Sequence, residues 1–480
     1  MLSLDGAWQR AVVAAGVPDP GPGRQLDALG WVPVMVPENY GLEASLSAHF
    51  GPVYYRRRLG PFVARRATLV FDSVDYLADV WLGDRHLGHH EGYLAPFRFE
   101  VTGRLEGLST LTVRVQDPFE DLEDGGSIFS HRKRVIKGTL KYHDSRPGGL
   151  PGAQLTPGWT ARLGQSMTTG GIVGSVALVG TGALRLDAVF VTPLDPVTGL
   201  VHVAVAVDSA LPGAEDALVV LSVDGGERVA VPTSVVPGPG RLDLQCHLPG
   251  ASLWWPCSHA DLGGPSLHRL DVEVVHAGEV SDQRSVRFGL RTARVAGEPK
   301  RLVLNGRDVF VQAANYIPRQ HFAGVGKDFY LRDMELAARA HLNSLGVHAH
   351  VQSPACYEAA DEAGLLLFQD FALQWGYDSG SSTNPGFVDE ACRQIADMAY
   401  TLWNHPSVVY WACHNEPMAM FAPGGEPDPA EDWDNQVLDA ALERCLAGVE
   451  APPGQGGRHV HRASGIGDDL HLYDGSLSGG

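Results

Sequence analysis

Several features that would place the chain in a simple class are missing from the sequence. No stretch reaches about 18 consecutive apolar residues, the length that a membrane-spanning helix requires. The six cysteines form no C-x-x-C pair, so we interpret them as free, mostly buried thiols in a reducing, cytoplasmic compartment. The start of the chain, MLSLDGAWQRAVVAAG, has no basic region followed by an apolar one, and we expect no cleaved signal peptide.

Positive charge is also scarce. The 480 residues include 37 Lys and Arg against 56 Asp and Glu, which gives a formal net charge of −19. Long-range attraction to nucleic acid or to an anionic membrane is therefore not expected, and a neutral or cationic partner fits better. A hydrophobic fraction of 44% is enough for real cores, and the length suggests roughly three domains.

The first part of the chain has the pattern of an all-β protein. Residues 1–180 contain short alternating or β-branched runs such as ATLVFDSVDYLADVWLGDRHLG, separated by turn residues, which predicts a sandwich or jelly roll. Residues 181–294 continue with runs such as LVHVAVAVDS at the spacing of a second, smaller β-sandwich. We interpret the basic, glycine-rich stretch GSIFSHRKRVIKGTLKYHDSRPGGLPG as an inserted loop.

The pattern changes in residues 295–480. Apolar strands near residues 309, 343, 365, 407, 458 and 469 alternate with helical segments such as KDFYLRDMELAARAHL. Alternating βα units with continuously apolar strands predict a parallel sheet covered on both faces, as in a (β/α)₈ barrel. The active site of such a barrel lies at the carboxyl ends of its strands, so polar residues that follow an apolar strand are candidate site residues.

The strongest candidate is the stretch VVYWACHNEP, in which Asn415 and Glu416 come directly after an apolar strand. A carboxyl group at a partly buried strand end can have a raised pKa, which suits a general acid, although Glu-Pro also occurs as a simple loop start. Other candidate strand ends contribute Asn315, Tyr316, His348, His350, Asp370, Gln374, Trp375, Asp469, His471 and Tyr473. Amides, carboxylates and aromatic rings on one rim suit a polyhydroxylated ligand.

Two of these residues leave alternatives open. His348 and His350 alternate along an expected strand and form a possible metal pair, but the sequence places no third ligand near them. Asp370 is equally compatible with a helix cap. We expect no cofactor and no metal.

The order of these motifs resembles glycoside hydrolase family 2, in its branch of β-mannosidases and exo-β-glucosaminidases. The resemblance rests on VWLGDRHLGHHEGYLAPFRFEVT, LWWPCSHADLGGPSLHRL, YEAADEAGLLLFQDFALQW and HNEP, and it covers nearly the whole chain. It implies a jelly-roll sugar-binding domain, an immunoglobulin-like sandwich and a catalytic barrel. It also implies retaining hydrolysis of terminal β-linked sugars, with Glu416 as acid/base and Asn415 at the sugar 2-position.

The sequence departs from this family pattern in two places. Gly346 stands where many relatives have an Arg at the end of the second strand, which leaves His348 or His350 as its replacement. Residues 297–480 are also fewer than the roughly 250 of a full barrel. We count six strands and find no second carboxylate at a late strand end, so we expect an incomplete barrel, an N-terminal fragment of a longer enzyme that lacks the nucleophile.

Three hypotheses follow from the sequence. The first is a retaining exo-β-glycosidase, β-mannosidase-like, that acts on a carbohydrate substrate through Glu416. Its sugar-binding residues would be Asn415, His350, Asp370, Trp375, His471 and Tyr473. The second is a catalytically silent, carbohydrate-binding fragment, and the third is a metal-dependent hydrolase that uses His348 and His350.

Overall fold

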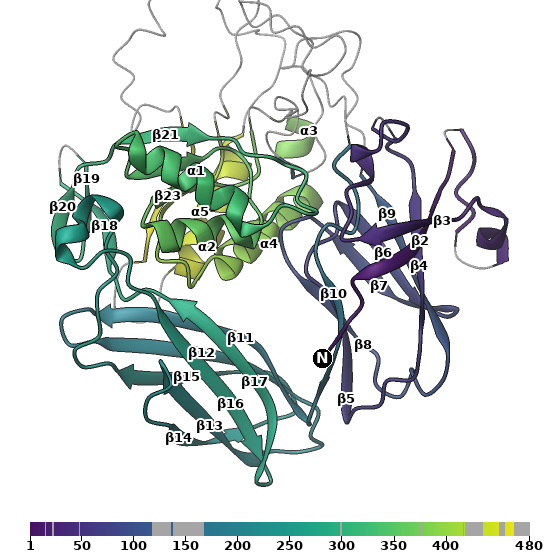
Figure 1. Ribbon diagram of the computed structural model, residues 1–480, viewed down its shortest axis with the longest axis horizontal. Helices are drawn as coiled ribbons and strands as arrows, with labels where there is room; N and C mark the ends of the chain where they lie inside the picture. The colour runs from purple at the N-terminus through teal and green to yellow at the C-terminus, as the bar shows by residue number, and fades with distance from the viewer. Residues whose placement is uncertain are drawn as a thin grey trace, which may run out of the picture.

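Two β-rich regions and one parallel α/β region make up the molecule. The computed structural model describes residues 1–14, 16–21, 24–47, 49–117, 136–137, 168–297, 300–374, 377, 379–415, 417, 435–450 and 457–464. In Figure 1 the N-terminal β region lies on the right, the second β region at the lower left and the α/β region above it.

The N-terminal β region is built from two antiparallel sheets, with strand orders β3-β2-β4-β9-β6-β7 and β1-β10-β5-β8. Its strands are β1 (Leu2–Ser3), β2 (Gly6–Val12), β3 (Val32–Val36), β4 (Val53–Leu59), β5 (Arg66–Phe71), β6 (Leu77–Leu82), β7 (Arg85–Glu91), β8 (Phe97–Glu100), β9 (Ser109–Gln116) and β10 (Val176–Thr181). Leu111, Val113 and Val115 alternate along β9 and are fully buried between the sheets. This period of two is the pattern by which the sequence predicts a sandwich.

The second β region is a smaller sandwich of two antiparallel sheets, ordered β11-β12-β15 and β14-β13-β16-β17. Its strands are β11 (Leu184–Asp195), β12 (Leu200–Ser209), β13 (Glu215–Val223), β14 (Val229–Val235), β15 (Gly238–His247), β16 (His268–His276) and β17 (Glu279–Phe288). Val201, Val203, Val205 and Val207 of β12 are all buried in the core of this sandwich.

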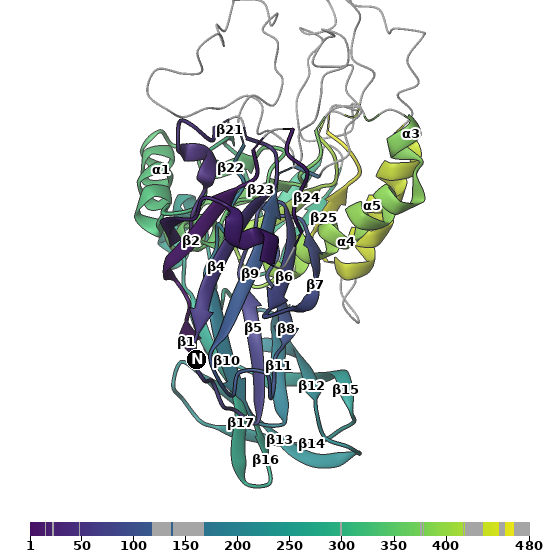
Figure 2. The same ribbon diagram turned by 90° about the vertical axis from the view of Figure 1, so that its right-hand side faces the viewer.

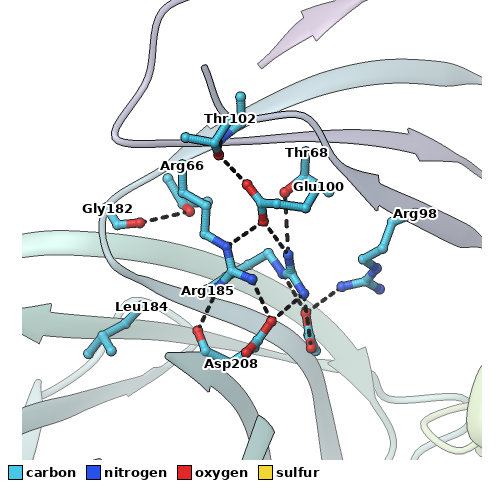
Figure 3. Close-up of polar contacts among 12 residues, drawn as sticks. Arg66, Thr68, Arg98, Glu100, Thr102, Gly182, Leu184, Arg185 and Asp208 are labelled. Atoms are coloured by element: carbon cyan, nitrogen blue, oxygen red, sulfur yellow. Dashed lines mark hydrogen bonds and ion pairs between the residues drawn. The ribbon is translucent and has the colours of Figure 1, made fainter. Parts of the chain in front are cut away.

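A charged network joins the two β regions, as Figure 3 shows. Arg66 donates to Glu100 at 2.7 Å and to Asp208 at 2.5 Å, so that it links β5 and β8 of the first region to β12 of the second. Arg185 of β11 also donates to Asp208, at 2.8 Å. Each of these two guanidinium groups has carboxylate partners on more than one strand. Such contacts stabilise the interface between the two β regions and restrict how the regions are oriented to each other.

A small antiparallel sheet of β18 (Ala293–Ala296), β19 (Arg301–Leu304) and β20 (Arg307–Val309) leads into the α/β region. The strand that we predicted near residue 309 belongs to this sheet and not to the parallel one. The turn at Asn305 and Gly306, both with positive φ, reverses the chain after β19, so β19 and β20 form a hairpin.

The parallel sheet has five strands in simple sequence order within the described residues: β21 (Ala313–Tyr316), β22 (Ser344–Val347), β23 (Leu366–Asp370), β24 (Val408–Ala412) and β25 (His459–His461). All four pairings are parallel. The strand predicted near residue 469 lies outside the described residues.

Helices cover the outer face of the parallel sheet. They are α1 (Lys327–Arg339), α2 (Pro354–Ala363), α3 (Ser379–Ser382), α4 (Pro385–Thr401) and α5 (Gln436–Glu450). The pairs α1 with α2 and α4 with α5 lie side by side; Figure 1 shows the first pair and Figure 2 the second. Helix α2 begins with proline at its first position and ends at Gly364, which has a φ of 71° that favours glycine. The described residues also contain 3₁₀ helices at Arg24–Ala28, Tyr40–Leu42 and Cys257–Leu262.

Strand β24 is buried over its whole length, which explains its continuous apolar sequence. Val408 and Trp411 pack in the core beneath the helices, whereas Val409, Tyr410 and Ala412 pack in a second core that includes Trp254. A strand covered on both faces needs apolar side chains on both faces.

The cysteines and the described helices bear on two expectations from the sequence. All six cysteines are free thiols, with Cys356 and Cys413 fully buried. None of the described helices combines the length and apolarity that crossing a membrane requires.

Candidate active site

The chain segments that follow the parallel strands are bonded to one another at the carboxyl edge of the sheet. Phe371 N–H donates to Ala412 O at 2.8 Å, and Cys413 N–H donates to His461 O at 2.9 Å. The hydrogen bonding of the sheet therefore continues past the ends of β23 and β24. The residues after these strands are held by backbone contacts and not by side chains alone, so their positions follow from the sheet.

Asn415 is held at this edge by two neighbouring segments, one after β23 and one after β25. Its N–H donates to Leu373 O at 3.1 Å, and it forms an isolated parallel bridge with Gln374. The Ser464 hydroxyl, which follows β25, donates to Asn415 Oδ1 at 3.0 Å. No described residue forms a hydrogen bond with the buried Nδ2 atom. The side chain thus has its acceptor bonded and its donor unbonded, which suits a ligand that brings an acceptor oxygen.

His414, just before Asn415, anchors the strand end to helix α5. Its ring is completely buried, and Nδ1 lies 2.7 Å from Asp439 Oδ1. The backbone oxygen of His414 accepts from Ser464 N–H at 3.0 Å. A fully buried ring that is hydrogen-bonded to a buried carboxylate is restricted in its orientation. The bond to Asp439 therefore ties the backbone next to Asn415 to helix α5.

His350 lies at the same edge and contacts the N-terminal β region. Its ring is only 1% exposed, and Nδ1 lies 2.8 Å from the hydroxyl oxygen of Tyr93. Burial, with a smaller contribution from the Lys137 ammonium, lowers the pKa of His350 to about 3, so the ring is neutral at physiological pH. No described residue bonds its Nε2 atom. His350 is therefore a second side chain of this edge with one polar atom bonded and one unbonded.

Asp370 ends β23 and binds the neighbouring turn. Its Oδ2 accepts from Ala349 N–H at 3.0 Å. No helix follows it directly, since α3 begins at Ser379, so the alternative role as a helix cap is wrong. Asp370 joins the end of β23 to the turn that carries His350.

The expected pairing of His348 and His350 along one strand is also wrong. Strand β22 ends at Val347, and Ala349 has a φ of 43°, so the two histidines flank a turn. The described residues contain no group of three or more His, Cys, Asp and Glu side chains arranged around a possible metal ion.

Five candidate site residues lie outside the described residues. These are Trp375, Glu416, Asp469, His471 and Tyr473. Their roles remain predictions. Of the predicted set, the structure brings together Asn415, His350 and Asp370 at the carboxyl ends of three strands.

Gly346, the position at which we expected an Arg in many relatives, lies within β22 opposite Asn315. A Cβ atom at this position would lie 3.1 Å from Asn315 Oδ1. A side chain here would therefore point towards Asn315, and glycine leaves that space without a cation from residue 346.

A cavity of about 480 Å³ lies at the opposite, amino end of the strands. It is lined in part by Arg291, Pro406, Glu450 and Arg458, which precede or flank β24 and β25. In barrel proteins this end serves stability, whereas the chemistry takes place at the carboxyl end. We therefore place the candidate site at the edge that carries Asn415.

Comparison with protein families gives two matches on the chain. Residues 184–291 match the model "Glycosyl hydrolases family 2", and residues 295–424 match "Glycosyl hydrolases family 2, TIM barrel domain". The two matches follow each other in the order of the two regions described above, and the second includes the strand end with Asn415. The chain belongs to glycosyl hydrolase family 2.

Curated relatives align with most of the chain. Beta-mannosidase B of Aspergillus clavatus is 26% identical over 387 residues, which are 76% of this chain and 44% of that protein. The Beta-glucuronidase of Mus musculus is 25% identical over 402 residues, which are 79% of this chain and 56% of that protein. The chain thus spans about half the length of the curated relatives it matches.

Solved family 2 structures share the fold. A beta-D-mannosidase from Dictyoglomus thermophilum superposes with a TM-score of 0.72 at 20% identity and covers 96% of this chain and 57% of its own. A GH2 beta-galacturonidase from Eisenbergiella tayi bound to galacturonate gives a TM-score of 0.69 at 17% identity. The superposition covers 93% of this chain and 69% of that protein's chain. These likenesses support the order of sandwich, sandwich and parallel α/β region.

Sequence reasoning missed three residues that hold this family 2 site together: Tyr93, Asp439 and Ser464. Tyr93 lies 257 residues before its partner, and no local pattern connects the two. Ser464 follows a strand of the expected sheet, so the same strand-end rule that found Asn415 also applies to it.

Proposed function

We propose that the protein is a retaining exo-β-glycosidase of β-mannosidase-like specificity, in which Glu416 is the acid/base. One observation carries this proposal. Asn415 is fixed at a strand end with its Nδ2 donor buried and unbonded by the described residues, and Glu416 is the next residue in the chain. An amide donor beside a carboxyl group suits a sugar whose hydroxyl and glycosidic oxygens both need partners.

The reaction assigns two successive roles to Glu416. Its carboxyl proton moves to the glycosidic oxygen while the bond between that oxygen and the anomeric carbon breaks, and a second carboxylate attacks the anomeric carbon. In the next step Glu416, now ionised, takes a proton from the water that releases the sugar. The proposal places the acid/base half of this pair and part of the sugar-binding rim within these 480 residues.

The rim residues have separate tasks under this proposal. Asn415 Nδ2 donates to the oxygen at the sugar 2-position, and His350 Nε2 is available to a second oxygen of the same ring. Asp370, Trp375, His471 and Tyr473 complete the subsite, the carboxylate by accepting from hydroxyl groups and the rings by stacking on the sugar.

A neutral sugar is favoured over a uronic acid. Gly346 provides no cation beside Asn315, and binding of a sugar carboxylate calls for an Arg or Lys at such a place. The names of the relatives include both beta-mannosidase and beta-glucuronidase, so the panel of substrates in the test must contain both classes.

The test uses the full-length protein that carries these residues together with the second carboxylate, and it compares initial rates on 4-nitrophenyl β-D-mannoside, β-D-glucosaminide, β-D-galactoside and β-D-glucuronide. We expect the mannoside to be hydrolysed fastest. Glu416→Gln, which keeps the shape but carries no transferable proton, is expected to lower kcat/KM by roughly 10²- to 10⁴-fold. The loss should be larger for methyl β-mannoside than for the aryl glycoside, because a poor leaving group needs more protonation.

Glu335→Gln is the matched control, since Glu335 is exposed on α1 and far along the chain from the site. It should leave the rates unchanged. Unchanged rates in Glu416→Gln would contradict the assignment of the acid/base. Binding of methyl β-mannoside without any hydrolysis would instead support a sugar-binding protein.

A further inference from the structure

Tyr93 reaches the candidate site from the N-terminal β region. It follows β7, after Gly92, whose Cα lies against Gln394 of α4 so closely that a Cβ atom would lie 2.9 Å from that side chain. The tyrosine is 2% exposed and packs in the core of the α/β region. The hydroxyl of Tyr93 thus lies in the α/β region, although β7, the strand that it follows, belongs to the N-terminal β region.

The hydroxyl of Tyr93 has two partners, and their chemistry fixes where its proton lies. Val351 N–H donates to the hydroxyl oxygen at 3.0 Å, and His350 Nδ1 lies 2.8 Å from the same oxygen. A backbone N–H can only donate, so the phenol proton remains for Nδ1. Burial holds the pKa of Tyr93 well above its usual value, which keeps that proton on the phenol oxygen.

The opposite assignment leaves a buried donor without a partner. If Nδ1 carried a proton and donated to Tyr93, the phenol oxygen would accept twice, and its own proton would have no acceptor among the described residues. Buried hydroxyl protons in native proteins are almost always bonded. The arrangement in which Tyr93 donates to an unprotonated Nδ1 satisfies every group.

The ring of His350 is also clamped in place. It stacks on Tyr93 with ring centroids 4.7 Å apart and an interplanar angle of 12°, and Phe322 lies 5.6 Å away with an angle of 30°. A stacked ring with one nitrogen bonded cannot turn over without breaking both contacts. The remaining atom, Nε2, is the buried one that no described residue bonds.

We propose that Tyr93 is a positioning residue that holds neutral His350 as the Nε2–H tautomer, so that His350 donates to an oxygen of the bound sugar. The role rests on the proposed glycosidase function for the identity of the ligand, but not for the tautomer. A β-sandwich side chain thereby sets the donor and acceptor pattern of the sugar site. Under this assignment the N-terminal region contributes to the reaction without touching the substrate.

The first test measures the tautomer directly and needs no activity. In a chain labelled with ¹⁵N in its 20 histidines, long-range ¹H–¹⁵N spectra at pH 7 separate protonated from unprotonated ring nitrogens, and the signals of His350 are those lost in His350→Gln. We expect unprotonated Nδ1 and protonated Nε2 in the native chain. The reverse pattern in the native chain would overturn the proposal without any further variant.

Tyr93→Phe keeps the stacked ring and removes the hydroxyl. The His350 signals should then move towards a mixture of the two tautomers. Tyr76→Phe is the matched control, because Tyr76 is equally buried between the same two regions but bonds Ile136 N–H and the Gln394 side chain. Unchanged His350 signals in Tyr93→Phe would contradict the assignment.

The second test separates positioning from general stability. On 4-nitrophenyl β-D-mannoside, Tyr93→Phe is expected to lower kcat/KM by roughly tenfold, as removal of a histidine's orienting partner does elsewhere. In a His350→Gln background, where the amide donor needs no tautomer, Tyr93→Phe should have little further effect. An equal loss in both backgrounds would show a merely structural role. If the full-length protein hydrolyses none of the four glycosides, the glycosidase proposal fails while the spectra still decide the tautomer.

Discussion

The two ends of the parallel sheet differ in whether their buried polar groups are hydrogen-bonded. At the amino end, Arg458 and Glu450 form an ion pair at 2.6 Å with both side chains 6% exposed. Arg291 donates to the backbone oxygens of Pro406 and Val408, at 2.9 and 2.6 Å. At the carboxyl end, Asn415 Nδ2 and His350 Nε2 are buried and no described residue bonds them.

This difference separates stability from recognition. A buried charge without a partner is very costly, and at the amino end Arg458 and Glu450 are paired while Arg291 is bonded to backbone oxygens. A buried neutral donor without a partner costs less, and a bound ligand that supplies an acceptor removes that cost. Asn415 and His350 therefore have donors that are available to a ligand. Arg458 is already paired with Glu450, so we assign it a role in stability.

The largest effect is expected at the amino end. Arg458→Ala leaves Glu450 buried without its cation and removes the stacking of the guanidinium over Trp411, at 4.5 Å. The free energy of unfolding in urea should fall by about 3 to 5 kcal/mol. Arg462→Ala is the control, since its pair with Glu443 is 48% and 33% exposed and should be worth at most about 1 kcal/mol. Equal losses in the two variants would contradict the contrast.

The pH dependence of stability tests the carboxyl end. The pKa of His350 is about 3 in the folded protein and near 6.5 in an unfolded chain, so the unfolded state binds more protons between these values. The contribution of neutral His350 to the free energy of unfolding is fully present above pH 6.5 and is lost as the pH falls towards 3. At pH 5 the free energy of unfolding should therefore be lower by roughly 2 kcal/mol than at pH 8.

Urea unfolding at pH 8 and pH 5, in the native chain and in His350→Gln, isolates this contribution. The groups that act on the ring are Lys137, which pairs with Asp75 and Asp117 at 2.7 Å, and the Tyr93 hydroxyl. They are the same in both chains, so the difference between the two pH slopes belongs to His350. His86→Gln, whose ring is half exposed, is the control. Identical slopes in native chain and His350→Gln would refute the assigned pKa.

Sequence patterns predicted those parts of the fold that depend on local periodicity. The alternation along β9 and β12 predicts two sandwiches, and the continuous apolar run of β24 predicts a strand buried on both faces. The pattern did not separate the hairpin that ends at Val309 from the first parallel strand, because both are short apolar runs. Nor did it show that Ala349 breaks the alternation of His348 and His350, because that depends on backbone angles.

The candidate site could be predicted only where its residues follow strands. Asn415 and Asp370 were found in this way, since the carboxyl ends of parallel strands meet at one edge. Tyr93 was not found, because its contact with His350 depends on how a β-sandwich packs against the α/β region. No residue near Tyr93 in the sequence signals that packing.

The smallest effect is expected at Ser464, which orients Asn415. Ser464→Ala removes the donor at 3.0 Å from Asn415 Oδ1, so the amide is free to turn its oxygen towards the ligand. A single neutral hydrogen bond is worth about 1 kcal/mol, and kcat/KM on 4-nitrophenyl β-D-mannoside should fall by roughly fivefold. Ser285→Ala is the control, because its hydroxyl bonds Asp271 on an exposed face of the second sandwich. If the amide is what Ser464 controls, an Asn415→Ala background should abolish the effect, since no side-chain amide is then left to orient. A loss that persists there would contradict this role, because alanine keeps the backbone N–H that donates to His414 O.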